Sequence, residues 1–446
     1  MKKVLLTVFG VAAIGAMLVP ARAQEDEKSF TFNGEVRARY EYLNNYIDQL
    51  DNSQSSDPND DSYSLAPYRV ILGITGTFAK NVTAHADIQY IGTFGDEFSP
   101  QKDFFPPIGQ FGTPYLFNTQ GVQLYTGWLE VSKIFGSEIG ARLGRQEHTY
   151  GTELFMGDND YYGGLSFDGL RGMWNHGHSD LNVWYYKVAE DNGPNPGAQG
   201  GANDSDFFGA SYDWNFNNGW GTVGGYALVG QDLNGNGPVF FPDSSVMTFG
   251  VRWNRPMMNG DKLNMFDWNA EYAMQSGDAG DPFGGSPSTD LSGWIGEAWF
   301  GFNYNLASSH GRVHVGLLAT SGDDFATTDE SEAFIPMYGD FHAYNRFGDL
   351  DWIDVFGPAN ITDINVGYEH WFGTSHYVMA AYHMFTMTED NGAPSDDLGD
   401  EIDLTYRYTY SKNLGFEFTI GQAMPGDAFL NQDDVQRITA QARLNW

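Results

Sequence analysis

The chain has 446 residues, with 23 Lys or Arg against 58 Asp or Glu and a formal net charge of −35. Aromatic residues make up 16% of it, glycine accounts for 55 residues, and cysteine is absent. The acidity argues against nucleic acid as a partner, because phosphate binding needs Lys and Arg, and the lack of cysteine excludes disulfides and thiolate metal ligands.

The N-terminus has the pattern of a signal peptide. A positively charged start precedes an apolar run over 4–19, and the small-residue cleavage pattern ARA follows at 21–23. We therefore expect residues 1–23 to be a signal peptide and 24–446 to be a single exported domain. An uncleaved N-terminal membrane anchor is the alternative. Beyond this run, no apolar stretch reaches the roughly 18 residues that a membrane-spanning helix needs.

The stretch NGEVRARYEYL, residues 33–43, introduces the pattern that dominates the rest of the chain. Apolar residues such as Val36 and Tyr40 alternate with charged residues such as Arg37 and Arg39. Strict alternation predicts a β-strand, because successive side chains point to opposite faces. One face of this strand is apolar and the other is charged.

The same alternation recurs to the C-terminus and predicts eighteen strands and no helix. The pattern does not fix the register of the strands near 121, 165, 180, 220 and 376. The predicted strands begin near residues 30, 67, 82, 121, 138, 165, 180, 206, 220, 245, 262, 293, 312, 361, 376, 400, 414 and 434.

The connections between these strands alternate in length. Eight short and nine long connections join the strands, so both termini lie on the short-turn side. Short strands with this loop pattern are typical of a transmembrane antiparallel β-barrel, whose closure satisfies every backbone hydrogen bond in lipid. We predict this all-β fold, with short periplasmic turns and long extracellular loops. A large soluble β-sandwich or propeller is the alternative.

The last predicted strand ends on an aromatic residue. Ile438, Leu444 and Trp446 share its apolar face. Outer-membrane barrels commonly end in this way, and we expect their assembly machinery to bind this end. In such a barrel the apolar strand faces contact membrane lipid and lipopolysaccharide, and the charged faces line a wet lumen.

Ten of the fourteen arginines fall on the polar faces of the predicted strands, together with carboxylates such as Glu35 and Glu41. Two interpretations remain open. The arginines pair with carboxylates on neighbouring strands and stiffen the wall, or they form a ladder of anion contacts along a pore. The candidate pore-lining residues are Arg37, Arg39, Arg69, Arg142, Arg171, Arg252, Arg312, Arg407, Arg437 and Arg443.

The long connections hold 38 Asp or Glu but only two basic residues, Lys102 and Arg346. Such a rim attracts cations and repels anions. The connection 232–243 also matches the D-x-N-x-N-G pattern of a calcium loop, although a turn between barrel strands is the alternative. A structural Ca²⁺ is the one cofactor this pattern predicts. Its candidate ligands are Asp232, Asn234, Asn236 and Asp243.

The longest predicted loop, 322–360, is acidic, but its centre at 334–347 is aromatic. Exposed clusters of large apolar side chains usually mark a binding or packing surface. We therefore expect the centre to fold inward and constrict the pore; a loop that covers its neighbours outside the lumen is the alternative. The candidate constriction residues are Tyr338, His342, Tyr344 and Arg346, whose rings and polar edges suit a carbohydrate.

Signatures of catalysis are missing. The sequence contains neither G-x-S-x-G nor H-E-x-x-H. The histidines of HGHS at 176–179 lie on a predicted short turn, where a metal site would lack further close ligands. We therefore expect no enzymatic activity.

Three stretches resemble the alginate-export family of outer-membrane barrels: FNGEVRARYEYLNN (32–45), LGRQEHTYGTELFMGDNDYYGGLSFDGLRGMW (143–174) and AFIPMYGDFHAYNRFGDLDW (333–352). The resemblance implies an eighteen-stranded barrel and, as in the type protein, an arginine-rich conduit for anionic alginate. The acidic rim departs from this pattern and argues against alginate itself. The residues that match the family motif are Arg142, Arg145, Gln146, Asp168 and Arg171.

Arg145 breaks the strand alternation, because it falls on the lipid-facing side. A bulge or a snorkelling side chain at the strand end would bring it to the lumen. We include Arg145 and Asp168 among the candidate solute-binding residues on the strength of the family motif.

Taken together, these patterns predict a passive channel of the Gram-negative outer membrane, a porin or exporter for small solutes or a polysaccharide. A cation-preferring general porin is one alternative. The other is a structural or surface-binding barrel with a closed lumen and Ca²⁺-binding acidic loops. The solute, the direction of transport and the oligomeric state do not follow from the sequence.

Overall fold

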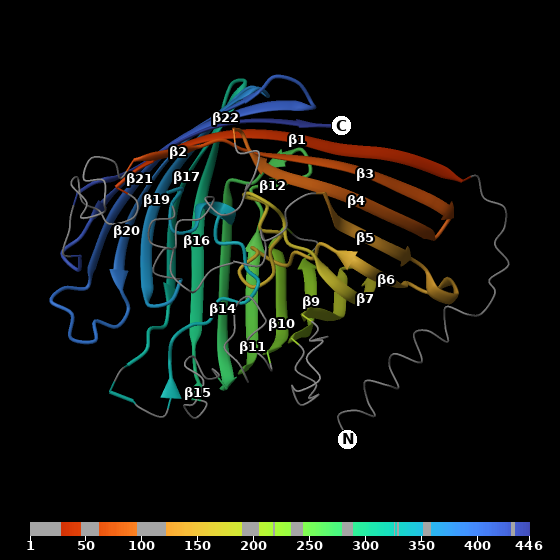
Figure 1. The fold of residues 1–446 in the computed structure, drawn as a ribbon, viewed down its shortest axis with the longest axis horizontal. Helices are drawn as coiled ribbons and strands as arrows, with labels where there is room; N and C mark the ends of the chain where they lie inside the picture. The colour runs from red at the N-terminus through yellow and green to blue at the C-terminus, as the bar shows by residue number, and fades with distance from the viewer. Residues whose placement is uncertain are drawn as a thin grey trace.

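In the computed structural model, the described residues are 28–45, 62–95, 122–189, 205–216, 219–232, 244–278, 289–324, 326–327, 330–350, 358–429 and 433–446. The predicted signal peptide lies outside them, as do Lys102 and three of the four candidate calcium ligands, Asn234, Asn236 and Asp243. The described residues form a closed antiparallel β-barrel (Figure 1).

Eighteen of the described strands form the barrel wall, the number that the sequence predicts. Each begins at most four residues from its predicted start. The wall strands are β1 (Ser29–Asn44), β3 (Pro67–Ala79), β4 (Val82–Thr93), β5 (Gln123–Val131), β6 (Ile139–Gln146), β7 (Phe167–His176), β8 (Ser179–Ala189), β9 (Ser205–Phe216), β10 (Gly221–Asp232), β11 (Ser244–Arg255), β14 (Phe266–Asp278), β16 (Trp294–Leu306), β17 (Ser309–Thr320), β19 (Ile361–Phe372), β20 (His376–Met387), β21 (Asp397–Thr409), β22 (Leu414–Pro425) and β23 (Val435–Asn445).

The first and last strands close the barrel. β1 pairs antiparallel with β3 on one side and with β23 on the other, where the register runs from Glu35↔Asn445 to Asn44↔Gln436. At the C-terminus, the Trp446 N–H donates to Gly34 O at 3.1 Å, and the Gly34 N–H donates to Trp446 O at the same distance. Closure removes the free sheet edges that lipid could not satisfy.

The connections between the wall strands contain short accessory elements. Among the described residues, the 3₁₀ turns are η1 (Ile134–Gly136) and η2 (Ala343–Asn345). The short strands are β2 (Tyr63–Leu65), β12 (Met258–Asn259), β13 (Lys262–Leu263), β15 (Asp290–Leu291) and β18 (Glu330–Ser331).

Among the described residues, no helix is long and apolar enough to cross a membrane.

Strand alternation divides the wall into two chemically different faces. On β1, the side chains of Arg37 and Arg39 are only 4% and 7% exposed, whereas Val36 and Tyr40 are 40% and 48% exposed. The same division holds on β3, where Arg69 is buried and Leu72 is exposed. The apolar face therefore points outward to lipid, and the charged face points into the lumen.

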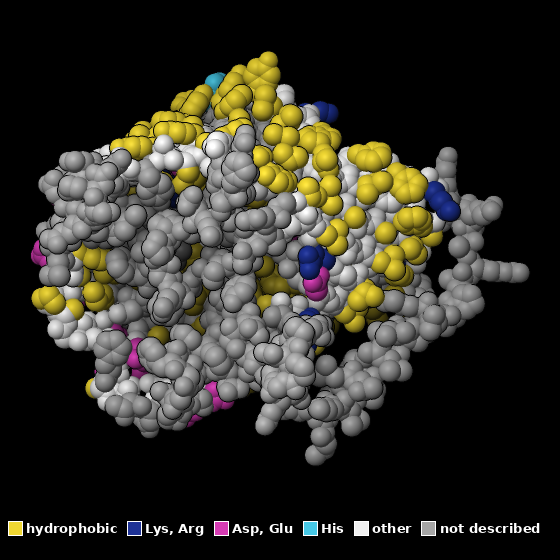
Figure 2. All heavy atoms as spheres, viewed as in Figure 1, with side chains coloured by type: hydrophobic (Ala, Val, Ile, Leu, Met, Phe, Trp, Pro, Cys, Tyr) yellow, Lys and Arg dark blue, Asp and Glu magenta, His cyan; other side chains and the backbone are white. Residues whose placement is uncertain are grey.

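The outer surface shows the expected chemistry. Figure 2 shows hydrophobic side chains spread over the outside of the strands, with few charges among them. Phe249, Val251, Phe300, Val315 and Leu404 are examples of apolar side chains exposed there. In lipid such side chains need no further cover, because the acyl chains supply it.

Candidate functional site

Two connections fold back into the barrel and pair with each other. The first is 147–165, between β6 and β7, and the second is 330–350, which precedes β19. The Tyr338 N–H donates to Phe155 O at 3.2 Å, and the Gly157 N–H donates to Tyr338 O at 2.8 Å. We call these two segments the inner loops. Figure 1 shows coils that cross the space inside the wall.

The inner loops pack against the lumen face of the strands, near the long-loop ends. The Tyr338 ring lies 5.4 Å from Phe167 and 4.7 Å from Phe207, centroid to centroid. On another part of the wall, Phe347 and Leu350 are buried against apolar side chains of β17 and of β19 to β23. Both clusters have the character of a protein core. Tyr338 therefore lies buried within the packed loops and does not line the passage, which differs from our expectation.

A buried arginine ties the two inner loops to the wall. Arg346 forms an ion pair with Glu297 of β16, and both side chains are 4% exposed. Its other guanidinium nitrogens donate to Thr152 O of the first inner loop and, at 2.8 Å, to Asp340 O of the second. One side chain thus fixes three parts of the chain. Neighbouring charges, above all Glu297, raise the pKa of Arg346 against the opposing effect of burial.

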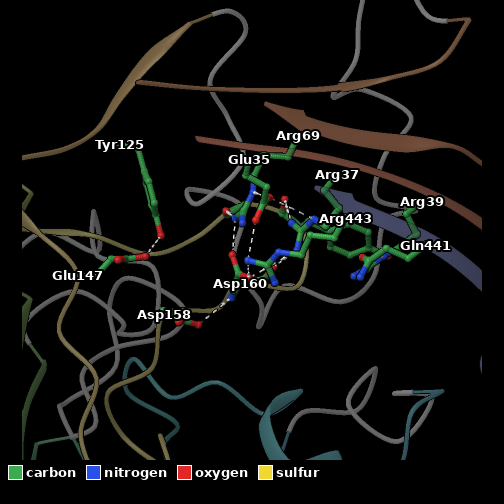
Figure 3. A network of polar contacts seen from close by, with 12 residues as sticks. Glu35, Arg37, Arg39, Arg69, Tyr125, Glu147, Asp158, Asp160, Gln441 and Arg443 are labelled. Atoms are coloured by element: carbon green, nitrogen blue, oxygen red, sulfur yellow. Dashed lines mark hydrogen bonds and ion pairs between the residues drawn. The ribbon is translucent and has the colours of Figure 1, made fainter. Parts of the chain in front are cut away.

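A second network binds the first inner loop to the start of the barrel (Figure 3). Arg69 contacts Glu35 at 2.7 Å and Asp160 at 2.5 Å. Arg37 donates to Asp160 O at 2.5 Å, and Arg443 lies 2.6 Å from Glu35 and 3.1 Å from Asp160. Figure 3 shows these side chains converging on Asp160. Three arginines therefore share two carboxylates, and loop carbonyls accept further hydrogen bonds from Arg37 and Arg69.

The remaining strand arginines that face the lumen also have partners. Most of these contacts match the first of our two interpretations, in which arginines pair with carboxylates on neighbouring strands, whereas Arg39 pairs with Glu41 of its own strand and Arg171 with an amide. The pairs are Arg39–Glu41, Arg437–Glu41, Arg142–Glu130, Arg252–Asp213, Arg312–Asp267, Arg312–Glu369 and Arg407–Glu417, and Arg171 donates to the Asn182 amide oxygen.

Arg145 and Asp168 lie outside the lumen. They face each other across β6 and β7 on the same side as Leu143, which is 44% exposed on the outer wall. Their bidentate ion pair has contacts of 2.8 and 2.6 Å. Figure 2 shows acidic and basic side chains in contact within the hydrophobic outer surface. We therefore correct the expectation that this pair lines the pore: no bulge reverses the side-chain direction between β6 and β7, and the two charges neutralise each other on the outer wall.

Two cavities flank the tip of the second inner loop. One, of about 340 Å³, lies between residues 342–349 and the wall from β16 to β21. The other, of about 440 Å³, lies beside Tyr161 and the lumen face of β1 and β21 to β23. His342 and Arg407 border both cavities, and Tyr344 and Arg346 border the first. Three of the four candidate constriction residues thus gather beside open space inside the barrel.

His342 is held at this position by a ring stack. Its imidazole lies 4.2 Å from the Tyr161 ring at an angle of 17°. The Arg39 guanidinium covers the Tyr161 ring at 3.8 Å. Arginine, tyrosine and histidine therefore form a layer between the wall and the second inner loop.

Three carboxylates meet where the inner loops touch. Glu153, Asp158 and Asp340 can place one oxygen each within 4.8 Å of one another. Burial, followed by the charge of Asp158, raises the pKa of Glu153 to about 7. Burial and Asp160 raise the pKa of Asp158, whereas His342 lowers the pKa of Asp340 against the effect of burial. Of the candidate calcium ligands, Asp232 ends β10, and the other three lie outside the described residues.

The sequence reasoning missed the first inner loop. Its residues Leu154, Phe155 and Met156 are almost fully buried, although they belong to a long connection. Three consecutive large apolar side chains in an otherwise polar connection were the available signal. Large apolar side chains in a polar connection led us to expect that the second inner loop folds inward, and the same argument applies to the first.

Comparison with known proteins agrees with the barrel. The chain aligns over 94% of its length with OccK9 (OpdG) of Pseudomonas aeruginosa, covering 99% of that protein at 12% identity and a TM-score of 0.61. It aligns with OccK2 (OpdF) of the same organism at 13% identity, 94% and 97% coverage and a TM-score of 0.59. It also aligns with a BenF-like porin from Pseudomonas fluorescens Pf-5 at 12% identity, covering 94% of this chain and 99% of that protein at a TM-score of 0.56. At such identities the likeness concerns the fold.

No curated protein matches the sequence. The family model described as alginate export matches residues 30–442, which span nearly the whole barrel. The structure supplies the eighteen closed strands that the resemblance of residues 32–45, 143–174 and 333–352 implied. The chain is an outer-membrane β-barrel that belongs to the alginate export family.

Proposed function

We propose that the protein is a passive outer-membrane channel whose lumen the two inner loops narrow, and that it does not select for anions. The observation that carries this is the pairing of the lumen arginines. Within the described residues, each of the eleven that we place inside the barrel, the ten of the strands and Arg346, has a carboxylate or amide partner. Ten of them contact a carboxylate, whereas Arg171 contacts the neutral amide of Asn182. An arginine whose charge a carboxylate compensates attracts a passing anion weakly.

The excess of acidic residues supports a preference for cations or for uncharged solutes. Carboxylates outnumber basic residues by 58 to 23, and several line the lumen with the arginines. A polyanion such as a uronate chain would meet this field throughout its passage. The alginate that the family is named for is therefore not the solute we propose here.

Further assignments follow from the channel function. We propose that residues 1–23 direct export and are then cleaved as a signal peptide. We also propose assembly through the C-terminal Trp446 and contact with lipopolysaccharide at the outer rim. Transport needs no cofactor, since diffusion down a gradient needs no chemical step. The family and the fold point to a non-enzymatic channel.

Planar-bilayer recording tests this function. Purified protein in a KCl gradient is expected to conduct, with a reversal potential at zero or on the cation-preferring side. A strong anion preference would overturn the proposed selectivity. The absence of any current from a correctly folded barrel would favour the closed, surface-binding alternative.

A further inference from the structure

One tyrosine of the second inner loop points into open space although its neighbours are packed. Tyr344 is 60% exposed, whereas Arg346 and Phe347 on the same loop are buried. Its backbone has a φ of +61°, a conformation that costs free energy in a residue with a side chain. The loop therefore holds this ring in the first cavity at the expense of local strain.

A tryptophan of the wall extends the aromatic surface. The Trp299 ring of β16 lies 6.3 Å from the Tyr344 ring, and the two planes differ by 30°. The Arg312 guanidinium lies 5.1 Å from the Trp299 centroid, and the Arg346 guanidinium lies 5.7 Å from the Tyr344 centroid. The two rings are thus near-parallel neighbours in the lining of the first cavity.

Polar groups line the same cavity, and each of its three arginines, Arg312, Arg346 and Arg407, forms an ion pair with a carboxylate. Glu369 accepts from Arg312 at 2.5 Å and from the Tyr377 hydroxyl at 2.9 Å. Asp363 accepts from the Asn365 amide at 2.8 Å and lies 2.9 Å from His383. Glu369 therefore has little acceptor capacity left for a cation. Asp363 makes both contacts through Oδ2, and within the described residues its buried Oδ1 has no hydrogen-bond partner. The arginines, being paired, have little net charge for an anion.

We propose that this cavity binds the ring of an uncharged saccharide, with Tyr344 and Trp299 under the apolar face of the ring. The proposal rests on the channel function proposed above. A sugar ring has an apolar face that stacks on aromatic rings, and hydroxyls that both donate and accept hydrogen bonds. The volume of the first cavity, about 340 Å³, lies within the range of roughly 300–1,000 Å³ that is typical of small-molecule sites. The surrounding ion pairs offer hydrogen bonds without a net charge that would favour a uronate.

Blockade of single-channel current measures the binding. Maltotriose, an uncharged probe, is expected to interrupt the current of the wild-type channel, and sodium glucuronate or choline chloride to do so at least about tenfold more weakly. Tyr344→Ala and Trp299→Ala are each expected to raise the half-blocking concentration of maltotriose about tenfold, the order expected from the loss of one aromatic stacking contact. Tyr344→Phe keeps the ring and is expected to stay within about twofold of wild type.

Tyr406→Ala is the control, because Tyr406 is an exposed ring on the outer wall of β21. Equal blockade of wild type and Tyr344→Ala would overturn the saccharide site while leaving the channel function intact. Tighter blockade by glucuronate or choline would overturn the ligand class. If no variant conducts, the channel function fails. Calorimetry with maltotriose then decides the site: heat lost in Tyr344→Ala supports it, and no heat in wild type overturns it.

Discussion

At the scale of single residues, charge pairing is the organising feature of the lumen. Arg346 shows how strongly the pairing is built into the structure, because its guanidinium joins Glu297 of the wall to both inner loops. Removing either the arginine or the carboxylate of a buried ion pair leaves the other charge uncompensated. Such residues therefore control whether the inner loops stay in place.

Replacing Arg346 by alanine is expected to loosen the inner loops. Loss of one member of a buried ion pair costs about 3–5 kcal/mol, so urea unfolding in detergent should show a clear loss of stability. Single-channel currents should become larger or noisier as the loops move. Arg145→Ala breaks a pair on the outer wall and is the control for lumen current. Quiet currents of wild-type size in a folded Arg346→Ala barrel would contradict this role.

The acidic contact between the inner loops should respond to pH. Glu153, whose pKa is about 7, faces Asp158, Asp340 and the Arg346 guanidinium. It holds its proton more tightly in the folded protein than in an unfolded chain. Its contribution to stability is therefore full below about pH 4.5 and is lost as the pH rises through 7. Open-channel fluctuations are expected to increase between pH 5 and pH 8, and Glu153→Gln should remove that dependence. A pH response that persists in this variant would assign the effect to other groups.

Two arginines of β6 provide a matched test of which face conducts. Arg142 lies in the lumen, paired with Glu130, and Arg145 lies on the outer wall, paired with Asp168. Arg142→Gln leaves the Glu130 charge uncompensated and should shift the reversal potential towards cations. Arg145→Gln removes the same charge outside the lumen and should leave the reversal potential unchanged. Equal shifts in both variants would contradict the assignment of faces.

At the scale of elements, the inner loops act as one unit held by main-chain hydrogen bonds and two apolar clusters. A barrel of eighteen strands is wide enough to leave an aqueous channel when it is empty. Its conductance is therefore set by what fills it and much less by the wall. The inner loops are the elements on which mutations should change transport most.

Deleting residues 335–348 removes the apolar centre of the second inner loop and should raise conductance several-fold, because it opens a wide barrel. Strands β17 and β19 should still form, since their pairing does not involve the loop. A deletion of 391–394, in an exposed connection between β20 and β21, is the control. Unchanged conductance in the folded 335–348 deletion would show that the passage lies elsewhere.

At the scale of the whole molecule, the closed barrel sets both orientation and chemistry. Both ends of the barrel chain lie on the short-turn side, at the start of β1 and the end of β23. In outer-membrane barrels that side is periplasmic. The long connections, with most of the acidic residues, are then outside the cell.

Epitope tags should reveal this orientation. A tag at residue 395, in a long connection, is expected to be labelled on intact cells. A tag at residue 411, in the short turn between β21 and β22, is expected to be labelled only after permeabilisation. Reversed labelling would contradict the topology.

The architecture of the barrel wall follows from the amino-acid pattern alone. Alternation with a period of two assigns each strand residue to lipid or lumen, and closure follows because lipid tolerates no unpaired backbone. The eighteen strands, their order and the direction of Arg37, Arg39 and Arg69 were therefore predictable. The inward course of the second inner loop was also predictable from its aromatic centre.

The arrangement inside the wall depends on long-range contacts that the amino-acid pattern does not show. A period of two cannot say which carboxylate an arginine meets, because Asp160, which pairs with Arg69, reaches the lumen from a connection that has no period. The pairing of 147–165 with 330–350, the burial of Tyr338 and the exposure of Tyr344 depend on contacts between segments about 180 residues apart in the chain. The wall follows from a pattern of alternating residues that repeats along the chain. The site depends on contacts between distant segments, which such a pattern does not encode.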